Sequence, residues 1–153
     1  MKCLVVSDSH GRSDLVNKLI DQYHSEVDVM IHCGDIEDYA ENFPEMMVVA
    51  GNNDIFYDFP DSLIVPFGKH RILVAHGHQF AYMRRVEKLA EAARKNNCDI
   101  VCFGHTHVAD IQTIHGVLVV NPGSLWRSRD GRGPSYALIE DNGKALEAKH
   151  IFL

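Results

Sequence analysis

Residues 2–10 read KCLVVSDSH, a short apolar run that ends in an aspartate and a histidine, Asp8 and His10. The run has the length of a β-strand, and its apolar residues are consecutive, which is typical of a strand buried on both faces. Later apolar runs end in the same way, with polar residues next to glycine. The groups that follow these runs are Gly34-Asp35, Gly51-Asn52, His76-Gly77-His78 and Gly104-His105-Thr106-His107.

The segments between these runs indicate the fold class. Apolar residues recur at helical spacing in residues 14–24, with Ser13 as the expected N-cap, and in residues 84–97. The first half of the chain therefore reads as strand–helix–strand, and the second half as mostly antiparallel hairpins. We expect one α/β domain over residues 1–153, with two sheets packed face to face and helices outside. The predicted strands are residues 2–7, 27–33, 46–50, 62–67, 71–75, 99–103, 111–114, 117–120, 136–140 and 145–151.

Composition narrows the function classes. With 153 residues and 46% hydrophobic side chains, the chain has the size and core of one globular domain. The net charge of −6 argues against nonspecific nucleic-acid binding. No apolar run is long enough to span a membrane, and the apolar N-terminal stretch reads as a first strand, not as a signal peptide. The four cysteines form no C-x-x-C pair and read as reduced buried thiols, so we expect a cytoplasmic protein.

The polar groups at the strand ends have the chemistry of a metal site. In α/β sheets, ligands bind beyond the carboxyl ends of the strands. If the backbone there is extended, residues i and i+2 point the same way, so Asp8 and His10 would share one metal, and His105 and His107 would reach neighbouring metals. Carboxylates with imidazoles suit Mn, Fe, Zn, Ni or Co, and the absence of thiolates argues against a structural zinc. Seven candidate ligands are enough for two ions: Asp8, His10, Asp35, Asn52, His76, His105 and His107.

The motifs DSH, GD, GNND, HGH and GHTH, in this order, resemble the calcineurin-like metallophosphoesterase superfamily. The short chain and the later Asn121-Pro122-Gly123-Ser124 are similar to its small YfcE-like phosphodiesterase branch. The resemblance implies a four-layer αββα sandwich of two mixed β-sheets flanked by helices. It also implies that Asp35 bridges two metals. One metal would be bound by Asp8, His10, Asp35 and His107, and the second site would be completed by Asn52, His76 and His105.

These assignments predict a metal-dependent phosphodiesterase that acts on a small phosphate ester. A water bridging two divalent ions, with Mn expected first and Ni, Zn, Fe or Co as alternatives, would become a hydroxide near neutral pH and attack phosphorus. The alternative is a non-catalytic scaffold that binds protein partners on the same fold, as the retromer subunit of this branch does. The complete ligand set favours catalysis. The resemblance permits a homo-oligomer, and no membrane partner is expected.

The leaving group poses a separate question. Many superfamily members have a histidine after the motif asparagine, where this chain has Asn53, whose amide cannot act as a general acid. We therefore expect a weaker enzyme on poor leaving groups. His78 could substitute as the proton donor, or it is a solvated loop histidine. The predicted catalytic residues are Asp35, Asn52 and His78, and the predicted substrate contacts are Asn53, His78 and Ser124.

For several other residues the sequence is consistent with two different roles. His32 reads either as a core residue or as a hydrogen-bonded neighbour of the metal ligands, and Asp54 either orients nearby groups or forms a turn. Trp126 could stack on a nucleobase or cover a neighbouring segment. The arginines in the same loop, Arg127, Arg129 and Arg132, read as a solvated basic loop or as contacts to substrate phosphate.

Overall fold

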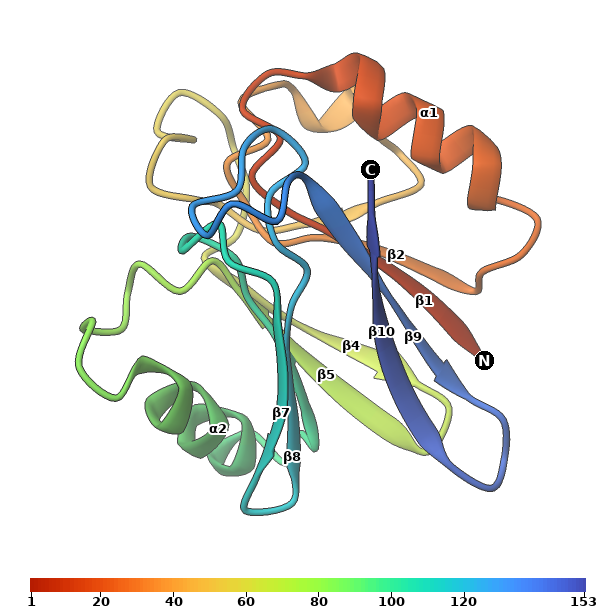
Figure 1. The fold of residues 1–153 in the computed structure, drawn as a ribbon, viewed down its shortest axis with the longest axis vertical. Helices are drawn as coiled ribbons and strands as arrows, with labels where there is room; N and C mark the ends of the chain where they lie inside the picture. Colours follow the sequence, from red (N-terminus) through yellow and green to blue (C-terminus); the bar gives the residue numbers. More distant parts are fainter.

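The structure, a computed structural model, describes all 153 residues and contains two five-stranded mixed sheets. The first sheet has the order β10-β9-β1-β2-β3. Strands β1, β2 and β3 are parallel, and β9 runs antiparallel to both β1 and β10. Its strands are β1 Lys2–Val6, β2 Val29–His32, β3 Met47–Val48, β9 Ser135–Asp141 and β10 Leu146–Phe152. Strands from the two ends of the chain therefore pair side by side (Figure 1).

The second sheet comes entirely from the middle of the chain. Its order is β4-β5-β6-β8-β7, with β5, β6 and β8 parallel and the outer strands antiparallel to their neighbours. Its strands are β4 Ser62–Phe67, β5 His70–Ala75, β6 Ile100–Cys102, β7 Asp110–Ile114 and β8 Val117–Asn121. The helices are α1 Ser13–Tyr23, the short 3₁₀ helix η1 Ala40–Asn42, and α2 Arg85–Lys95.

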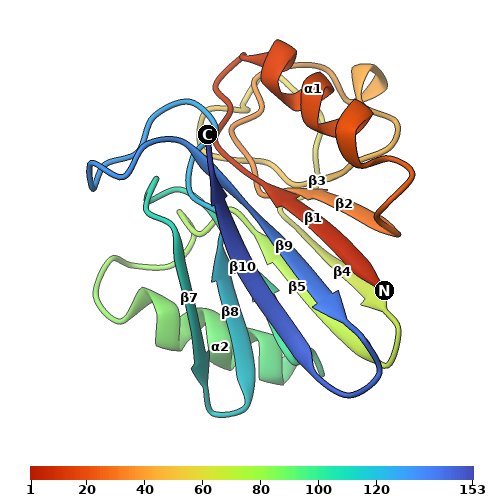
Figure 2. The same ribbon diagram turned by 45° about the vertical axis from the view of Figure 1, so that its right-hand side comes forward.

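The core explains why the strands have consecutive apolar residues. In β1, Cys3 and Val5 point into the cluster of 14 buried residues between the two sheets. Leu4 and Val6 point to the other face, where they pack with residues of α1. On the far side, residues of α2 pack on the outer face of the second sheet. Figures 1 and 2 show α1 and α2 on opposite sides of the paired sheets, which confirms the predicted four-layer αββα sandwich.

Two local predictions need correction. Ser13 is not the N-cap of α1: the cap residue is Arg12, which makes no side-chain cap bond, and the Ser13 hydroxyl donates to the Asp38 carboxylate at 2.6 Å instead. The strands predicted at residues 27–33 and 46–50 are shorter, at Val29–His32 and Met47–Val48. No helix is long and apolar enough to cross a membrane.

Candidate metal centre

Five loops converge at one end of the sandwich. Each follows a strand, and together they carry all seven predicted ligands to the same place, because the carboxyl ends of parallel neighbouring strands meet at one edge. The loop after β1 carries Asp8 and His10, and the loops after β2 and β3 carry Asp35 and Asn52. The loop after β5 carries His76, and the loop after β6 carries His105 and His107.

The centre of the cluster is one oxygen of Asp8. Asp8 Oδ1 is buried and has no hydrogen-bond partner. The Nε2 atoms of three histidines surround it, at 3.2 Å for His107, 3.7 Å for His10 and 3.8 Å for His76. The other oxygen, Oδ2, accepts bonds from the Ser7 hydroxyl and from the backbone N–H of His105 at 3.0 Å. A buried carboxylate oxygen without a donor, ringed by imidazole nitrogens, fits a metal cation.

Asp35 joins the two halves of the cluster. Its Oδ2 lies 3.3 Å from His76 Nε2 and 3.8 Å from His10 Nε2. Two overlapping groups of ligand atoms result, Asp8 with His10 and His107, and Asp8 with Asp35 and His76, each within 4.8 Å. The set is therefore large enough to hold two ions that share carboxylates.

Three histidines are oriented by hydrogen bonds on their far side. The Nδ1–H of His76 donates to the carbonyl of Cys33 at 2.7 Å, and that of His107 donates to the carbonyl of Arg127 at 2.9 Å. The Nδ1–H of His10 donates to the Glu37 carboxylate at 2.7 Å. Each bond fixes the tautomer, so that Nε2 presents its lone pair to the centre. Glu37 was not among the residues predicted from the sequence, where its only signal was its place two residues after Asp35 in GDIE.

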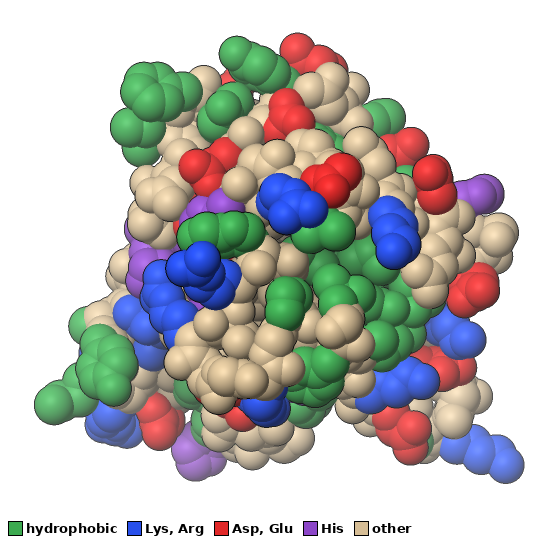
Figure 3. Space-filling model, turned by 45° about the horizontal axis from the view of Figure 1, so that its top comes forward, with side chains coloured by type: hydrophobic (Ala, Val, Ile, Leu, Met, Phe, Trp, Pro, Cys, Tyr) green, Lys and Arg blue, Asp and Glu red, His purple; other side chains and the backbone are tan.

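Asn52 and His105 complete the second side of the cluster. Asn52 Oδ1 lies 3.0 Å from His76 Nε2 and 3.2 Å from His105 Nδ1. Burial and the charge of His76 lower the pKa of His105 to about 4, so that its imidazole is neutral, as a metal ligand requires. His105 is partly exposed, and histidine side chains reach the surface at this end of the molecule (Figure 3).

The carboxylates are ionised in this environment. Burial by itself would raise the pKa of Asp8, but the nearby imidazoles of His10, His107 and His76 bring it far below its usual range. Burial also opposes ionisation of Asp35, and His76 again lowers the pKa of that carboxyl. The cluster therefore holds two negative charges in a largely buried space, which attracts cations.

The backbone of the ligand loops differs from the extended form expected from the sequence. Asp8, His10, Asp35, His105 and His107 all have positive φ, between 45° and 70°. The expectation that i and i+2 align because the chain is extended is therefore wrong, and the side chains meet because each loop turns sharply after its strand. Non-glycine residues adopt this conformation at a cost of about 1 kcal/mol or more, and such strain gathers at functional sites.

Asp54 holds this strained backbone in place. It is 2% exposed, and its carboxylate accepts backbone N–H groups from Asp35 at 2.7 Å, Gly51 at 2.7 Å and Glu37 at 2.9 Å. Of the two interpretations left open, the orienting one is correct, because these bonds tie the loop after β2 to the loop after β3. Asp54 thus positions Asp35 without pointing into the cluster.

The predicted substrate contacts lie in three different settings. His78 is exposed, with its ring 5.4 Å from that of His76. The side chain of Asn53 is exposed, and its backbone N–H donates to Asp35 Oδ1 at 2.9 Å. Ser124 is fully buried: its hydroxyl donates to the carbonyl of Asp8 at 2.7 Å and accepts the N–H groups of Trp126 and Arg127. A substrate contact by Ser124 is therefore incorrect, because every group that it offers is already used to hold the loop after β1.

His32, at the end of β2, is hydrogen-bonded to the loop after β1 and to the loop after β2. It is fully buried, its Nδ1 accepts the N–H of Gly34, and its Nε2–H therefore donates to the Ser9 hydroxyl at 2.9 Å. Burial lowers the pKa of His32 to about 3, so the residue is neutral in the folded protein. Of its two interpretations, the hydrogen-bonded neighbour of the ligand loops is correct.

The neutrality of His32 predicts a pH dependence of stability. An unfolded histidine titrates near pH 6.5, so between about pH 6.5 and pH 3 the unfolded chain binds more protons than the folded one. We expect the free energy of unfolding of the metal-free protein to fall by about 2 kcal/mol between pH 7 and pH 5 from this residue. His32→Asn keeps the acceptor for Gly34 but not the titration. Its urea unfolding should lose this slope, and an unchanged slope would contradict the assignment.

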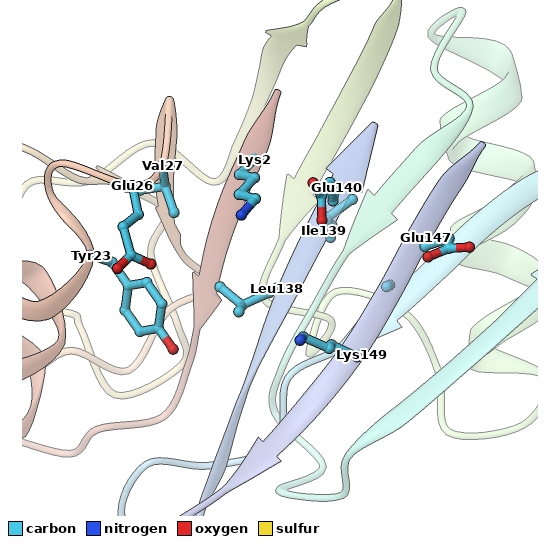
Figure 4. A pocket seen from close by; sticks show the side chains of 10 residues that line it. Lys2, Tyr23, Glu26, Val27, Leu138, Ile139, Glu140, Glu147 and Lys149 are labelled. Carbon is cyan, nitrogen blue, oxygen red and sulfur yellow. The ribbon is translucent and has the colours of Figure 1, made fainter. Parts of the chain in front are cut away.

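A separate hollow lies on the outer face of the first sheet. It has a volume of about 160 Å³ and lies beside the start of β1 and the end of α1. Figure 4 shows its lining, with Tyr23, Val27 and Leu138 between charged side chains such as Lys2 and Glu26. Because the ligand loops follow the opposite ends of the parallel strands, this hollow contains none of the predicted site residues.

The two-sheet fold and the carboxylate–imidazole cluster at its loop edge define a class of metal-binding α/β proteins, the metallophosphoesterases. Residues 1–144 match the family model described as the calcineurin-like phosphoesterase superfamily domain, and the chain belongs to this superfamily. The family resemblance stated from the motifs is thus confirmed.

Comparisons with individual proteins support the same family. The chain is 37% identical over 141 residues to the probable metallophosphoesterase YsnB of Bacillus subtilis, covering 91% of this chain and 83% of that protein. It is 28% identical over 148 residues to the phosphodiesterase MJ0936 of Methanocaldococcus jannaschii, covering 80% and 83%. A crystal structure of a predicted phosphoesterase from Streptococcus pneumoniae superposes with a TM-score of 0.92 at 30% identity, covering 99% of this chain and 88% of the other.

Proposed function

We propose that this protein is a phosphodiesterase that uses two divalent metal ions, with Mn²⁺ as the first choice, to hydrolyse a small phosphate ester in the cytoplasm. The observation that carries the proposal is Asp8 Oδ1, a buried oxygen without a donor that faces three imidazole Nε2 atoms. A relative named as a phosphodiesterase supports the reaction. Four free cysteines in the fold support a reducing compartment.

The residues take the following roles in this proposal. Asp8, His10 and His107 hold one ion, and Asp35 reaches both. His76, Asn52 and His105 hold the second. Ions bound there would lower the pKa of a bound water and neutralise charge on the phosphoryl oxygens. Glu37 and the carbonyls of Cys33 and Arg127 keep the imidazoles in the ligating tautomer.

His78 is the proposed proton donor to the leaving alcohol. It is exposed near His76 and can reach a bound ester from the open side of the cluster. Burial and the charge of His76 lower its pKa, so only a small fraction is protonated at neutral pH. A weak donor agrees with the expectation that poor leaving groups react slowly.

Metal removal tests the proposal directly. Exhaustive chelation should abolish hydrolysis of bis-nitrophenyl phosphate, and Mn²⁺ should restore it, since in the proposed mechanism the bound ions activate the attacking water. At a hundredfold excess of Mn²⁺ over its Kd, binding adds about 2.7 kcal/mol of stability, so the melting temperature should rise by about 5 to 10 °C. Activity that persists unchanged after chelation would refute the two-metal mechanism.

Asn53 offers a test of the leaving-group step. Asn53→His places an imidazole beside the cluster, and the rate on an alkyl phosphodiester should rise about tenfold relative to the rate on a nitrophenyl ester, because only the alkoxide needs a proton. The matched control is Asn17→His on the exposed face of α1, which should change neither rate. Equal effects of Asn53→His on both substrates would show that protonation is not limiting.

The alternative, a scaffold that binds protein partners on this fold, is less well supported by the site. A scaffold needs neither a complete ligand set nor strained ligand loops. Here the seven proposed ligands lie near one another, and five of them have positive φ. Since backbone strain costs stability, its concentration at this cluster supports a chemical role.

A further inference from the structure

A cleft of about 730 Å³ adjoins the metal centre and has no role in the proposed reaction. One wall is the segment that leads into α2, with Tyr82, Met83, Arg84 and Arg85. The other wall includes Thr106, the residue between the two predicted ligands of the loop after β6. The volume is in the range of small-ligand sites. A substrate at the metal centre can therefore extend into this cleft.

The cleft contains two arginines without acidic partners. The ion pairs of lysine and arginine in this structure are Arg12–Asp14, Lys95–Glu91 and Arg132–Asp130. Arg84 and Arg85 belong to none of them, although the chain has 21 acidic and only 15 basic residues. The acidic residues that line the cleft are Glu87 and Asp110, and Asp110 accepts a bond from Gln112 at 2.6 Å.

Arg85 is also held in position. Its Nε–H donates to the carbonyl of Phe80 at 3.1 Å, which leaves the terminal amino groups of the guanidinium free. Arg85 lines the same cleft as Thr106, which lies between the predicted ligands His105 and His107. A fixed guanidinium with free donors is suited to an anion.

The surrounding surface is rich in arginine. Five of the eight arginines of the chain lie in residues 84–85 and 127–132, and Figure 3 shows lysine and arginine side chains directly beside histidines at one edge. Three of the five have partners: Arg127 stacks on Trp126, Arg129 donates to the carbonyl of His105, and Arg132 pairs with Asp130. Arg84 and Arg85 remain available.

We propose that Arg84 and Arg85 bind a second phosphate group of the substrate, while the scissile phosphate lies at the metal centre. This inference rests on the proposed function and narrows its substrate class to esters of alcohols that carry another phosphate. Guanidinium groups donate two parallel hydrogen bonds to phosphate oxygens, a geometry that lysine lacks. Tyr82 and Met83, exposed by 87% and 75%, would cover the organic part of such a substrate.

The test compares two substrates with the same scissile bond. They are the nitrophenyl ester of thymidine 5′-phosphate with and without a phosphate on the 3′-hydroxyl, both assayed by nitrophenolate release. The parent protein should show a KM about tenfold lower for the 3′-phosphorylated ester, as expected for one charge-assisted contact. Arg84→Gln combined with Arg85→Gln should reduce this preference to less than twofold. Arg94→Gln, which removes one positive charge at the far end of α2, should keep it, and each of Arg84→Gln and Arg85→Gln alone should reduce it.

A binding experiment tests the cleft assignment independently of the proposed reaction. Calorimetry on the metal-loaded protein compares thymidine 3′,5′-bisphosphate with thymidine 5′-phosphate without any turnover. If neither ester is hydrolysed but the bisphosphate binds about tenfold more tightly, and only while Arg84 and Arg85 are present, the cleft assignment stands and the proposed reaction fails. If both esters are hydrolysed with equal KM, or the double variant keeps the preference, the cleft assignment is overturned and the reaction stands.

Discussion

Asp8→Asn is expected to lower kcat/KM for bis-nitrophenyl phosphate by about 10³-fold or more and to remove most of the bound metal. The reason is that Asp8 belongs to both groups of ligand atoms, while His10, His76 and His107 each belong to only one. Asparagine has the same shape but no charge, so the ion proposed for Asp8, His10 and His107 loses an anionic ligand, and the cluster keeps only the negative charge of Asp35. A loss of 10³-fold corresponds to about 4 kcal/mol of transition-state stabilisation. Elemental analysis of the purified variant and steady-state kinetics measure the two effects.

Asp14→Asn is the matched control for this variant. Asp14 undergoes the same chemical change on the exposed first turn of α1, where it pairs only with Arg12. It should keep full metal content and activity. The melting temperature supplies a second measurement: Mn²⁺ should raise it for the parent and for Asp14→Asn, but hardly for Asp8→Asn. If Asp8→Asn kept two ions and most of its activity, the central position of Asp8 in the proposed metal centre would be wrong.

The sequence predicted the position of the cluster because each ligand directly follows an apolar run. A buried strand has a recognisable composition, and its end fixes where the next side chain lies. Asp8, Asp35 and His76 are each within three residues of the end of a strand. Parallel neighbouring strands end at the same edge of their sheet, so the pattern predicts which ligands meet within each sheet. The two edges meet because the sheets pack face to face.

The loops themselves were not predictable in this way. Aspartate and histidine adopt positive φ more often than most non-glycine residues, but residue type alone does not show which copies do so, and the positive φ of Asp8 and His107 was therefore not predicted. Glu37 was missed for a similar reason. Its bond to His10 joins residues 27 positions apart, and only the tertiary fold shows which acidic side chain faces which imidazole.

Ser124 was predicted as a substrate contact, whereas in the structure it supports a loop. It follows a family motif, and the sequence alone could not distinguish a serine that faces substrate from one that supports a loop. Its hydroxyl makes three bonds to backbone groups, including the carbonyl of Asp8. A short polar side chain in a loop commonly bonds nearby backbone groups, and burial leaves it no other role.

Gly51→Ala is expected to lower kcat/KM by about 10²-fold and the free energy of unfolding by about 2 kcal/mol. A Cβ at this position would overlap the carboxylate and the backbone nitrogen of Asp35, both well inside contact distance. Asp35 cannot simply rotate away, because its N–H is bonded to Asp54 and its Oδ1 accepts the N–H of Asn53. The Asp35 carboxylate must therefore shift, and a displacement of about 1 Å at a reacting centre costs about 10²-fold in rate.

Gly131→Ala separates this effect from the general cost of replacing glycine. Gly131 has a φ of +80°, and a Cβ added there would meet nothing within 4 Å, so alanine costs only backbone strain, of about 1 kcal/mol, and no activity. At Gly51 the cost is a collision with a proposed metal-bridging carboxylate, so stability and metal affinity should fall together. Urea unfolding and Mn²⁺ titration measure both. A Gly51→Ala variant that loses stability but keeps its metal affinity would show that the Asp35 carboxylate does not bridge the ions.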